Sequence, residues 1–233
     1  MNQVYSVLLL GFLLGIKHAF DTDHIAAIST FAAENKHPLK AALVGAFWGM
    51  GHTTTLFFSG MLVLLLRIKI PENVTLVFEF MVGLMLILLG FNSLSKIVNQ
   101  PHMHTHRHGE KDHVHTHSSE DKKHHHRHKR SFFVGTIHGL AGSGALTLLV
   151  LASTPSVYWG MIYILIFGFG SIVSMSLVRI LFGLPFVYAG NKLPIVEKYL
   201  KVSTGFFSMI LGTFLAYKIG FDDKLLLSLF GNI

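Results

Sequence analysis

Cysteine is absent from this 233-residue chain, and charged residues make up only 13% of it. The missing thiols exclude disulfides, thiolate zinc sites and cysteine nucleophiles, which leaves histidine, carboxylates and methionine as possible metal ligands. The sequence also has no phosphate-binding loop and no His-Glu-x-x-His pattern, so it offers no motif for ATP hydrolysis or for a common zinc protease. Apolar residues are in excess, at 51%, which favours lipid as the solvent for the fold.

The apolar residues form long runs that recur along the whole chain, unlike the single short run of a secretory signal. A helix needs about 20 apolar residues to cross the hydrocarbon core of a bilayer. We therefore predict an all-α polytopic membrane protein with six transmembrane helices, near residues 4–32, 39–66, 74–95, 132–153, 157–182 and 202–219.

The segment between the third and fourth spans is polar and carries eleven of the sixteen histidines. A segment of this composition cannot form a packed core. It divides the chain into a three-helix repeat at 1–98, a disordered His-rich loop at 99–130 and a second three-helix repeat at 131–233. Most of the excess positive charge, +7 overall, also lies in this loop, so membrane topology explains the charge better than nucleic-acid binding.

The positions of lysine and arginine predict the orientation, because positive residues are retained on the cytoplasmic side. The connections after the first, third and fifth spans carry most of these residues. In the short loops alone, that face has five lysines and arginines and the opposite face has two. We predict that both termini lie outside and that the His-rich loop lies in the cytoplasm, with the protein in the plasma (inner) membrane.

The chain resembles itself across its midpoint, where three segments recur at offsets of 120, 119 and 122 residues. Each half has three predicted spans, an odd number, so the second half must enter the membrane from the opposite side. We therefore predict a 3+3 inverted repeat, which is common in secondary transporters. The matching segments are Gly15–Ala19 with Gly135–Gly139, Trp48–His52 with Phe167–Ser171, and Gly83 and Gly90 with Gly205 and Gly212.

A cluster of ionisable residues interrupts the first span, where Lys17, His18, Asp21, Asp23 and His24 lie between two apolar runs. A charged residue near the bilayer centre costs about 2.5–3.5 kcal/mol on insertion scales. We expect these side chains to face a cavity in which a bound cation offsets their desolvation and repulsion. A continuous helix would direct Asp23 away from the others, so we also predict a break in the helix at this motif.

Two further histidines lie at membrane depth. His52 follows Gly49-Met50-Gly51 in the second span, where small residues allow close helix approach, and His138 in the fourth span is the repeat mate of the first motif. The carboxylates of the first motif are replaced there by Ser143 and glycines. The predicted metal ligands are His18, Asp21, Asp23, His24 and His52, and further candidates are His138, Ser143 and Lys17, which would balance the carboxylates without an ion.

The ligand types restrict the choice of ion. Imidazole nitrogen combined with carboxylate oxygen, without thiolate, suits nickel, cobalt, zinc or manganese better than Cu(I). Magnesium and calcium prefer all-oxygen sites that need no histidine. The residues alone therefore predict a divalent transition metal.

The motifs also resemble those of a known family. His-Ala-Phe-Asp-Thr-Asp-His at 18–24 resembles the signature of the nickel/cobalt transporter (NiCoT) family, and Gly-His-Thr-Thr at 51–54 resembles that family's next motif. The segment at 138–144 is similar to the short urease-accessory-type members. The chain departs from the long members in having six predicted spans instead of eight and no acidic signature in its second half. The resemblance implies a nickel or cobalt permease that binds the ion through His18, Asp21, Asp23, His24 and His52.

Our leading hypothesis is a secondary permease that carries Ni²⁺ or Co²⁺ inward, with no catalysis and no cofactor. Three alternatives stay open: efflux through the same site, an intramembrane metal hydrolase, and a membrane-tethered metal store that acts through the loop alone. The hydrolase lacks a glutamate beside the cluster as general base.

The expected partners are the lipid bilayer, the metal ion and a cytoplasmic metallochaperone or nickel-enzyme maturation factor, without nucleic acid. Near the cytoplasmic end of the fifth span, Arg179 is expected to reach the interface. The loop histidines would buffer the metal; they are His102, His104, His106, His108, His113, His115, His117, His124, His125, His126 and His128.

Overall fold

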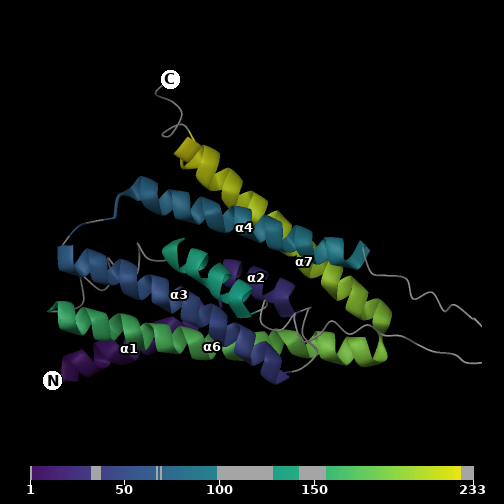
Figure 1. Ribbon diagram of the computed structural model, residues 1–233, viewed down its shortest axis with the longest axis horizontal. Coiled ribbons are helices and arrows are strands. Elements are labelled where there is room, and N and C mark those ends of the chain that lie inside the picture. Colours follow the sequence, from purple (N-terminus) through teal and green to yellow (C-terminus); the bar gives the residue numbers. More distant parts are fainter. Residues whose placement is uncertain are drawn as a thin grey trace, which may run out of the picture.

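The computed structural model describes residues 2–32, 38–66, 68, 70–98, 128–141 and 156–226, and within these ranges the regular structure is entirely helical. A further helix, unlabelled in Figure 1, covers residues 128–141. The others are α1 (Asn2–His18), α2 (Thr22–Ala32), α3 (Pro38–Leu66), α4 (Glu72–Val98), α6 (Val157–Lys192) and α7 (Pro194–Tyr217), which continues into a π-helical turn, η1 (Lys218–Asp222).

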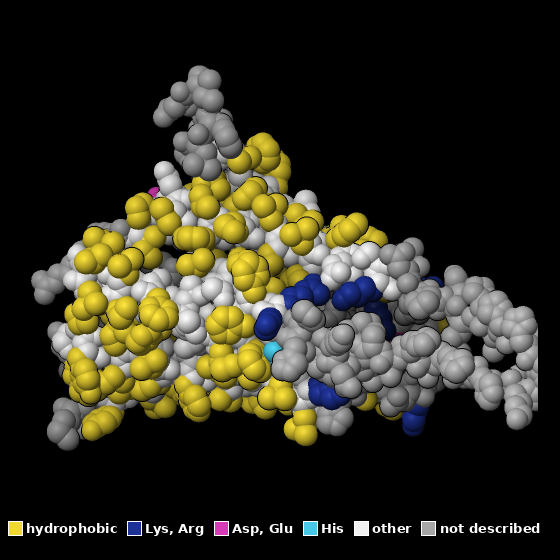
Figure 2. Space-filling view, in the orientation of Figure 1, with side chains coloured by type: hydrophobic (Ala, Val, Ile, Leu, Met, Phe, Trp, Pro, Cys, Tyr) yellow, Lys and Arg dark blue, Asp and Glu magenta, His cyan; other side chains and the backbone are white. Residues whose placement is uncertain are grey.

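Four of the described helices, α3, α4, α6 and α7, are long and apolar enough to cross a membrane, and α1 is a shorter apolar helix. Hydrophobic side chains cover most of the face in Figure 2, as expected where lipid surrounds a helical protein. The chain is therefore a multi-pass helical membrane protein. The expectation of six spans is met only in part, because the first span is divided into α1 and α2 and the fourth is described only over 128–141.

The break expected in the first span falls at the ionisable motif. The chain turns after α1 through bonds from Phe20 N to Lys17 O (2.9 Å) and from Asp21 N to His18 O (3.1 Å). Lys17 and His18 occupy the last turn of α1, and Asp23 occupies the first turn of α2. Each charge thus lies at the helix end whose dipole it compensates, which stabilises two helices in place of one.

The second half of the broken span, α2, lies inside the molecule, where it packs against α4, α6 and α7. Ala26, Ala27 and Ile28 are fully buried. The hydroxyls of Ser29 and Thr30 donate to carbonyls one turn back, so these polar groups are satisfied within the helix. The sequence around the motif therefore reaches the interior instead of the lipid (Figure 1).

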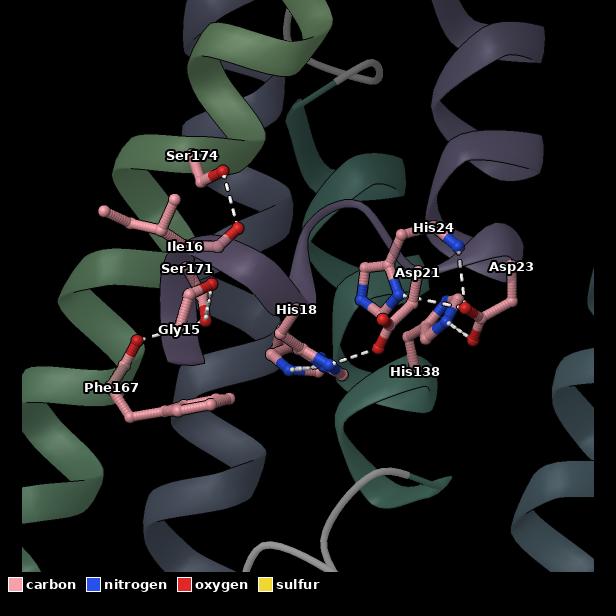
Figure 3. A network of polar contacts seen from close by, with 11 residues as sticks. Gly15, Ile16, His18, Asp21, Asp23, His24, His138, Phe167, Ser171 and Ser174 are labelled. Carbon is pink, nitrogen blue, oxygen red and sulfur yellow. Dashed lines mark hydrogen bonds and ion pairs between the residues drawn. The ribbon is translucent and has the colours of Figure 1, made fainter. Parts of the chain in front are cut away.

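Close backbone contacts at glycines join α1 to α6. A methyl group at Gly15 would overlap the Phe167 carbonyl, and one at Gly170 would lie 2.5 Å from the Phe12 carbonyl. The Ser171 hydroxyl donates to Gly15 O at 3.2 Å, which fixes the end of α1 that leads into the motif (Figure 3).

The 128–141 helix packs on α3 in the same way. A methyl group at Gly51 would overlap the Phe132 carbonyl, and one at Gly135 would overlap the Trp48 carbonyl. The Thr55 hydroxyl donates across this contact to Thr136 O at 3.1 Å.

A third glycine-mediated contact joins α4 to α7, which cross in Figure 1. A methyl group at Gly83 would lie 3.0 Å from the Gly212 carbonyl, and one at Gly90 would lie 2.5 Å from the Gly205 carbonyl. The repeated glycines found in the sequence thus lie at the points where helix backbones approach most closely.

The prediction that Arg179 reaches the membrane interface was wrong. Its side chain is fully buried, its guanidinium donates to Phe31 O at 3.0 Å, and the same group lies 5.1 Å from the centre of the Phe31 ring. The physical reason is that α6 does not end near residue 182 but continues through Pro185 to Lys192, so Arg179 lies well inside the helix. It joins α6 to the last turn of α2.

Candidate metal centre

Six ionisable side chains meet around the break between α1 and α2, and Figure 3 shows those from α1, α2, the turn between them and the 128–141 helix. His18 ends α1, Asp21 lies in the turn, and Asp23 and His24 begin α2. His52 comes from the middle of α3, and His138 from the 128–141 helix. We call these six residues the His/Asp cluster. His24, His52 and His138 are only 1%, 0% and 2% exposed, so three imidazoles are withdrawn from solvent together.

His18 connects the turn to α3. Its Nδ1 lies 2.7 Å from Asp21 Oδ2, and its Nε2 lies 3.2 Å from His52 Nε2. The ring of Phe167 on α6 lies 5.5 Å from the His18 ring and covers one side of it. Asp21 is half exposed, with 49% of its side chain accessible, and holds the His18 ring from the outside.

Asp23 connects α2 to the 128–141 helix. Its Oδ2 accepts a hydrogen bond from His138 Nε2 at 2.6 Å, and its Oδ1 accepts from the His24 backbone N–H at 3.0 Å. The same Oδ1 lies 3.3 Å from His24 Nδ1. One carboxylate therefore contacts two buried imidazoles that come from different parts of the chain.

Three ring nitrogens of the cluster have no hydrogen-bond partner among the described residues: His24 Nε2, His52 Nδ1 and His138 Nδ1. A buried polar atom without a partner costs about 1–3 kcal/mol, so each such atom calls for an explanation. A ligand that accepts lone pairs from several imidazoles at once is one explanation, and a metal cation is such a ligand.

The possible ligand atoms gather in two groups of three, and within each group all atoms lie within 4.8 Å of one another. Two nitrogens that bind one first-row divalent ion at about 2.1 Å lie about 3.0–3.4 Å apart. The 3.2 Å between His18 Nε2 and His52 Nε2 matches this separation, and an ion bound there would leave His52 Nδ1 without a partner among the described residues. The groups are His18, His24 and His52, and Asp23, His24 and His138.

Trp48 forms one wall of the cluster and was not predicted from the sequence. Its ring stacks on His24 at 6.0 Å with an angle of 12° between the planes, and lies 5.8 Å from the His138 ring. The sequence did carry a signal, because Trp48 precedes His52 by four residues and so shares its helix face.

The remaining predicted site residues lie elsewhere. Lys17 is exposed at the end of α1. Ser143 and the loop histidines other than His128 lie outside the described residues. His128 begins the 128–141 helix, so the last three residues of the expected loop are helical, and its ring lies 4.7 Å from Phe47.

Comparison with known proteins identifies the family. The chain is 37% identical over 227 residues to the urease accessory protein UreH of Bacillus sp. (strain TB-90), and the alignment covers 97% of each protein. The chain belongs to the UreH-type urease-accessory family. This membership confirms the resemblance to nickel/cobalt transporters drawn from the motifs.

The chain also matches a second family and two plant proteins. The family described as the cytochrome C biogenesis protein transmembrane region matches residues 69–214, so the chain belongs to this broader group as well. Two Arabidopsis thaliana proteins, chloroplast proteins FOR GROWTH AND FERTILITY 2 and 1, are each 26% identical, over 74% and 71% of this chain and 46% of their own length. No solved structure matches the chain significantly.

Proposed function

We propose that this chain is a secondary permease that carries divalent nickel or cobalt into the cytoplasm through the His/Asp cluster. The observation that carries the proposal is the burial of three imidazoles with unpartnered ring nitrogens beside a carboxylate, at a helix break in a multi-pass membrane protein. Ionisable groups at such depth generally mark an ion pathway. The name of the UreH relative, a urease accessory protein, supports delivery of the ion to a nickel-enzyme maturation factor or metallochaperone.

The chemistry of the cluster supports a transition-metal cargo. Imidazole nitrogens replace the water ligands that a nickel or cobalt ion loses on entering the membrane, and the carboxylates offset part of its charge. Magnesium and calcium would gain little from histidines. The ion is transported, so it leaves the site in each cycle and serves as substrate instead of cofactor.

The glycine contacts support a 3+3 inverted repeat as the frame for transport. The pair Gly15 and Gly170 joins α1 to α6, and its repeat mates Gly135 and Gly51 join the 128–141 helix to α3 in the same manner. The third contact joins α4 to α7, which are themselves the corresponding helices of the two repeats. These three contacts are what a pseudo-two-fold axis between residues 1–98 and 131–233 would produce, and movement of one half against the other would alternate access.

The distribution of charge supports the proposed orientation in the membrane. Lysines and arginines gather toward one end of the face in Figure 2, whereas hydrophobic side chains cover the opposite end. Placing that positive end in the cytoplasm of a plasma-membrane protein puts the segment 99–130 on the same side and both termini outside. Its histidines would then receive arriving ions.

Nickel entry into proteoliposomes that contain a metal-sensitive dye tests the proposal. Wild-type protein should give saturable entry, Asp23→Asn should abolish it, and Asp222→Asn should not change it. Asp222 is a matched control because it is an exposed carboxylate in η1, far along the chain from the cluster. Equal entry with Asp23→Asn and the wild type would refute the proposal. Ion export from preloaded vesicles containing protein of known orientation would show efflux instead.

A further inference from the structure

We infer from the geometry that the His/Asp cluster holds the ion in two successive positions that share His24 as a common ligand. The first position is formed by His18, His24 and His52, and the second by Asp23, His24 and His138. This inference rests on the proposed permease function, because it describes how the cargo passes through the cluster. It extends that proposal by assigning a separate site to His138, on the other half of the chain.

The grouping of the ligand atoms favours two positions over one. His24 lies between the two groups, with its ring centre 4.5 Å from that of His18 and 4.0 Å from that of His138. His52 and His138 are farther apart, at 6.3 Å. Their separation is held by the glycine contacts of the 128–141 helix, because methyl groups at Gly135 and Gly139 would collide with the α3 backbone. Among the described residues, His52 and His138 belong to different groups of ligand atoms, and His24 is the member that both groups share.

The two positions differ in charge. The first offers three imidazoles, whereas the second offers two imidazoles and the carboxylate of Asp23. A divalent ion is therefore held more strongly at the second position, in surroundings where Coulomb interactions are weakly screened. At equilibrium the ion therefore occupies the second position, beside His138, more than the first, beside His52.

His24 is suited to remain attached while the other ligands exchange. It is the most buried of the four cluster residues on the broken span, stacked on Trp48 and with its backbone N–H bonded to Asp23. A shared ligand lets the ion change partners stepwise, so it need not be released uncoordinated at membrane depth, where the cost of a bare charge is largest.

His138 is the one ligand of the two groups, among the described residues, that comes from the second half of the chain. The first position is complete within residues 1–98, whereas the second requires both halves. Any movement of the halves relative to each other therefore changes the second position directly, and the first only through His24. The second position is the one that couples ion binding to alternating access.

Ligand-field absorption of Co²⁺ bound to the purified full-length protein tests this inference. Each spectrum is compared with that of His24→Asn, which removes the shared ligand and leaves the loop histidines as a common background. His52→Asn and His138→Asn should each retain one bound cobalt ion above that background, with different spectra. Asp23→Asn should weaken binding at the second position and so resemble His138→Asn, which guards against an effect of misfolding in a single variant.

Two results would overturn the inference. If His52→Asn and His138→Asn both match His24→Asn, one site uses all the ligands together; if both match the wild type, neither histidine binds the ion. Flux separates this inference from the proposed function. With two positions, both variants lose at least tenfold in entry rate while still binding cobalt. A wild-type protein that binds cobalt in both positions but carries none into vesicles would refute the permease and leave the two positions standing.

Discussion

Substituting Gly139 by alanine should reduce transport although it replaces none of the six residues of the His/Asp cluster. The new methyl carbon would lie 2.5 Å from the His52 carbonyl oxygen and 3.1 Å from the His52 Cα. Relief to an ordinary contact of about 3.4 Å requires a shift of about 0.9 Å between the 128–141 helix and α3. His138 is the adjacent residue, so the shift displaces it relative to Asp23, from which its Nε2 lies 2.6 Å away.

The expected loss is large because a site tolerates little displacement. Ligands must be held within about 0.5 Å of their working geometry, and a misplacement of about 1 Å costs about a hundredfold in comparable sites. We therefore expect nickel entry to fall by about 10- to 100-fold. Alanine also favours a helix over glycine by about 1 kcal/mol, which partly offsets the strain, so the folded protein should persist.

Gly183→Ala on α6 is the matched control, since a methyl group there would meet no atom within 4 Å. It should leave nickel entry unchanged. The assay is the initial rate of entry into dye-containing proteoliposomes, normalised to the amount of folded protein measured by size exclusion. Wild-type entry in Gly139→Ala would refute the argument that the glycine contact positions His138.

Three other predictions concern Arg179, Asp21 and the His-rich segment. Arg179→Met should lower the free energy of unfolding by about 2 kcal/mol, because the Phe31 carbonyl loses a charged donor; unfolding in SDS followed by circular dichroism measures this, and unchanged stability would contradict it. Asp21→Asn should reduce entry by no more than about tenfold, whereas Asp23→Asn abolishes it, since Asp21 is half exposed and belongs to neither group of three; complete loss in Asp21→Asn would contradict this assignment. Deleting residues 101–127 should preserve entry into vesicles, which excludes a store that acts through the loop alone; complete loss with normal folding would favour that store.

Several features of the fold could be predicted because they depend on local composition. The apolar runs around α3, α4, α6 and α7 predicted membrane helices, and the charges between Lys17 and His24 predicted the break that divides α1 from α2. The small residues before His52 predicted close helix approach in the second span, although the sequence does not state which helix lies against them. The pairing of α1 with α6 depends on tertiary packing, which periodicity does not encode.

Other features of the site depend on contacts between distant parts of the chain. The repeat drew attention to His138, but only the fold places its Nε2 beside Asp23. Hydropathy placed Arg179 at an interface because an isolated arginine near the end of an apolar run usually lies there. The continuation of α6 through Pro185 could not be read from the sequence, since proline usually ends a helix.

The buried Arg179 gives α2 a role beyond carrying two ligands. This short helix begins with Asp23 and His24 in the cluster and ends at the Phe31 carbonyl that Arg179 holds. At about 1.5 Å per residue, the seven residues from His24 to Phe31 span only about 10 Å, so a displacement at one end is transmitted to the other. Movement of α6 therefore pulls on the same helix that carries the shared ligand His24. In the proposed permease the second half of the chain would act on the ion at two points, through His138 as a ligand and through Arg179 as the anchor of α2.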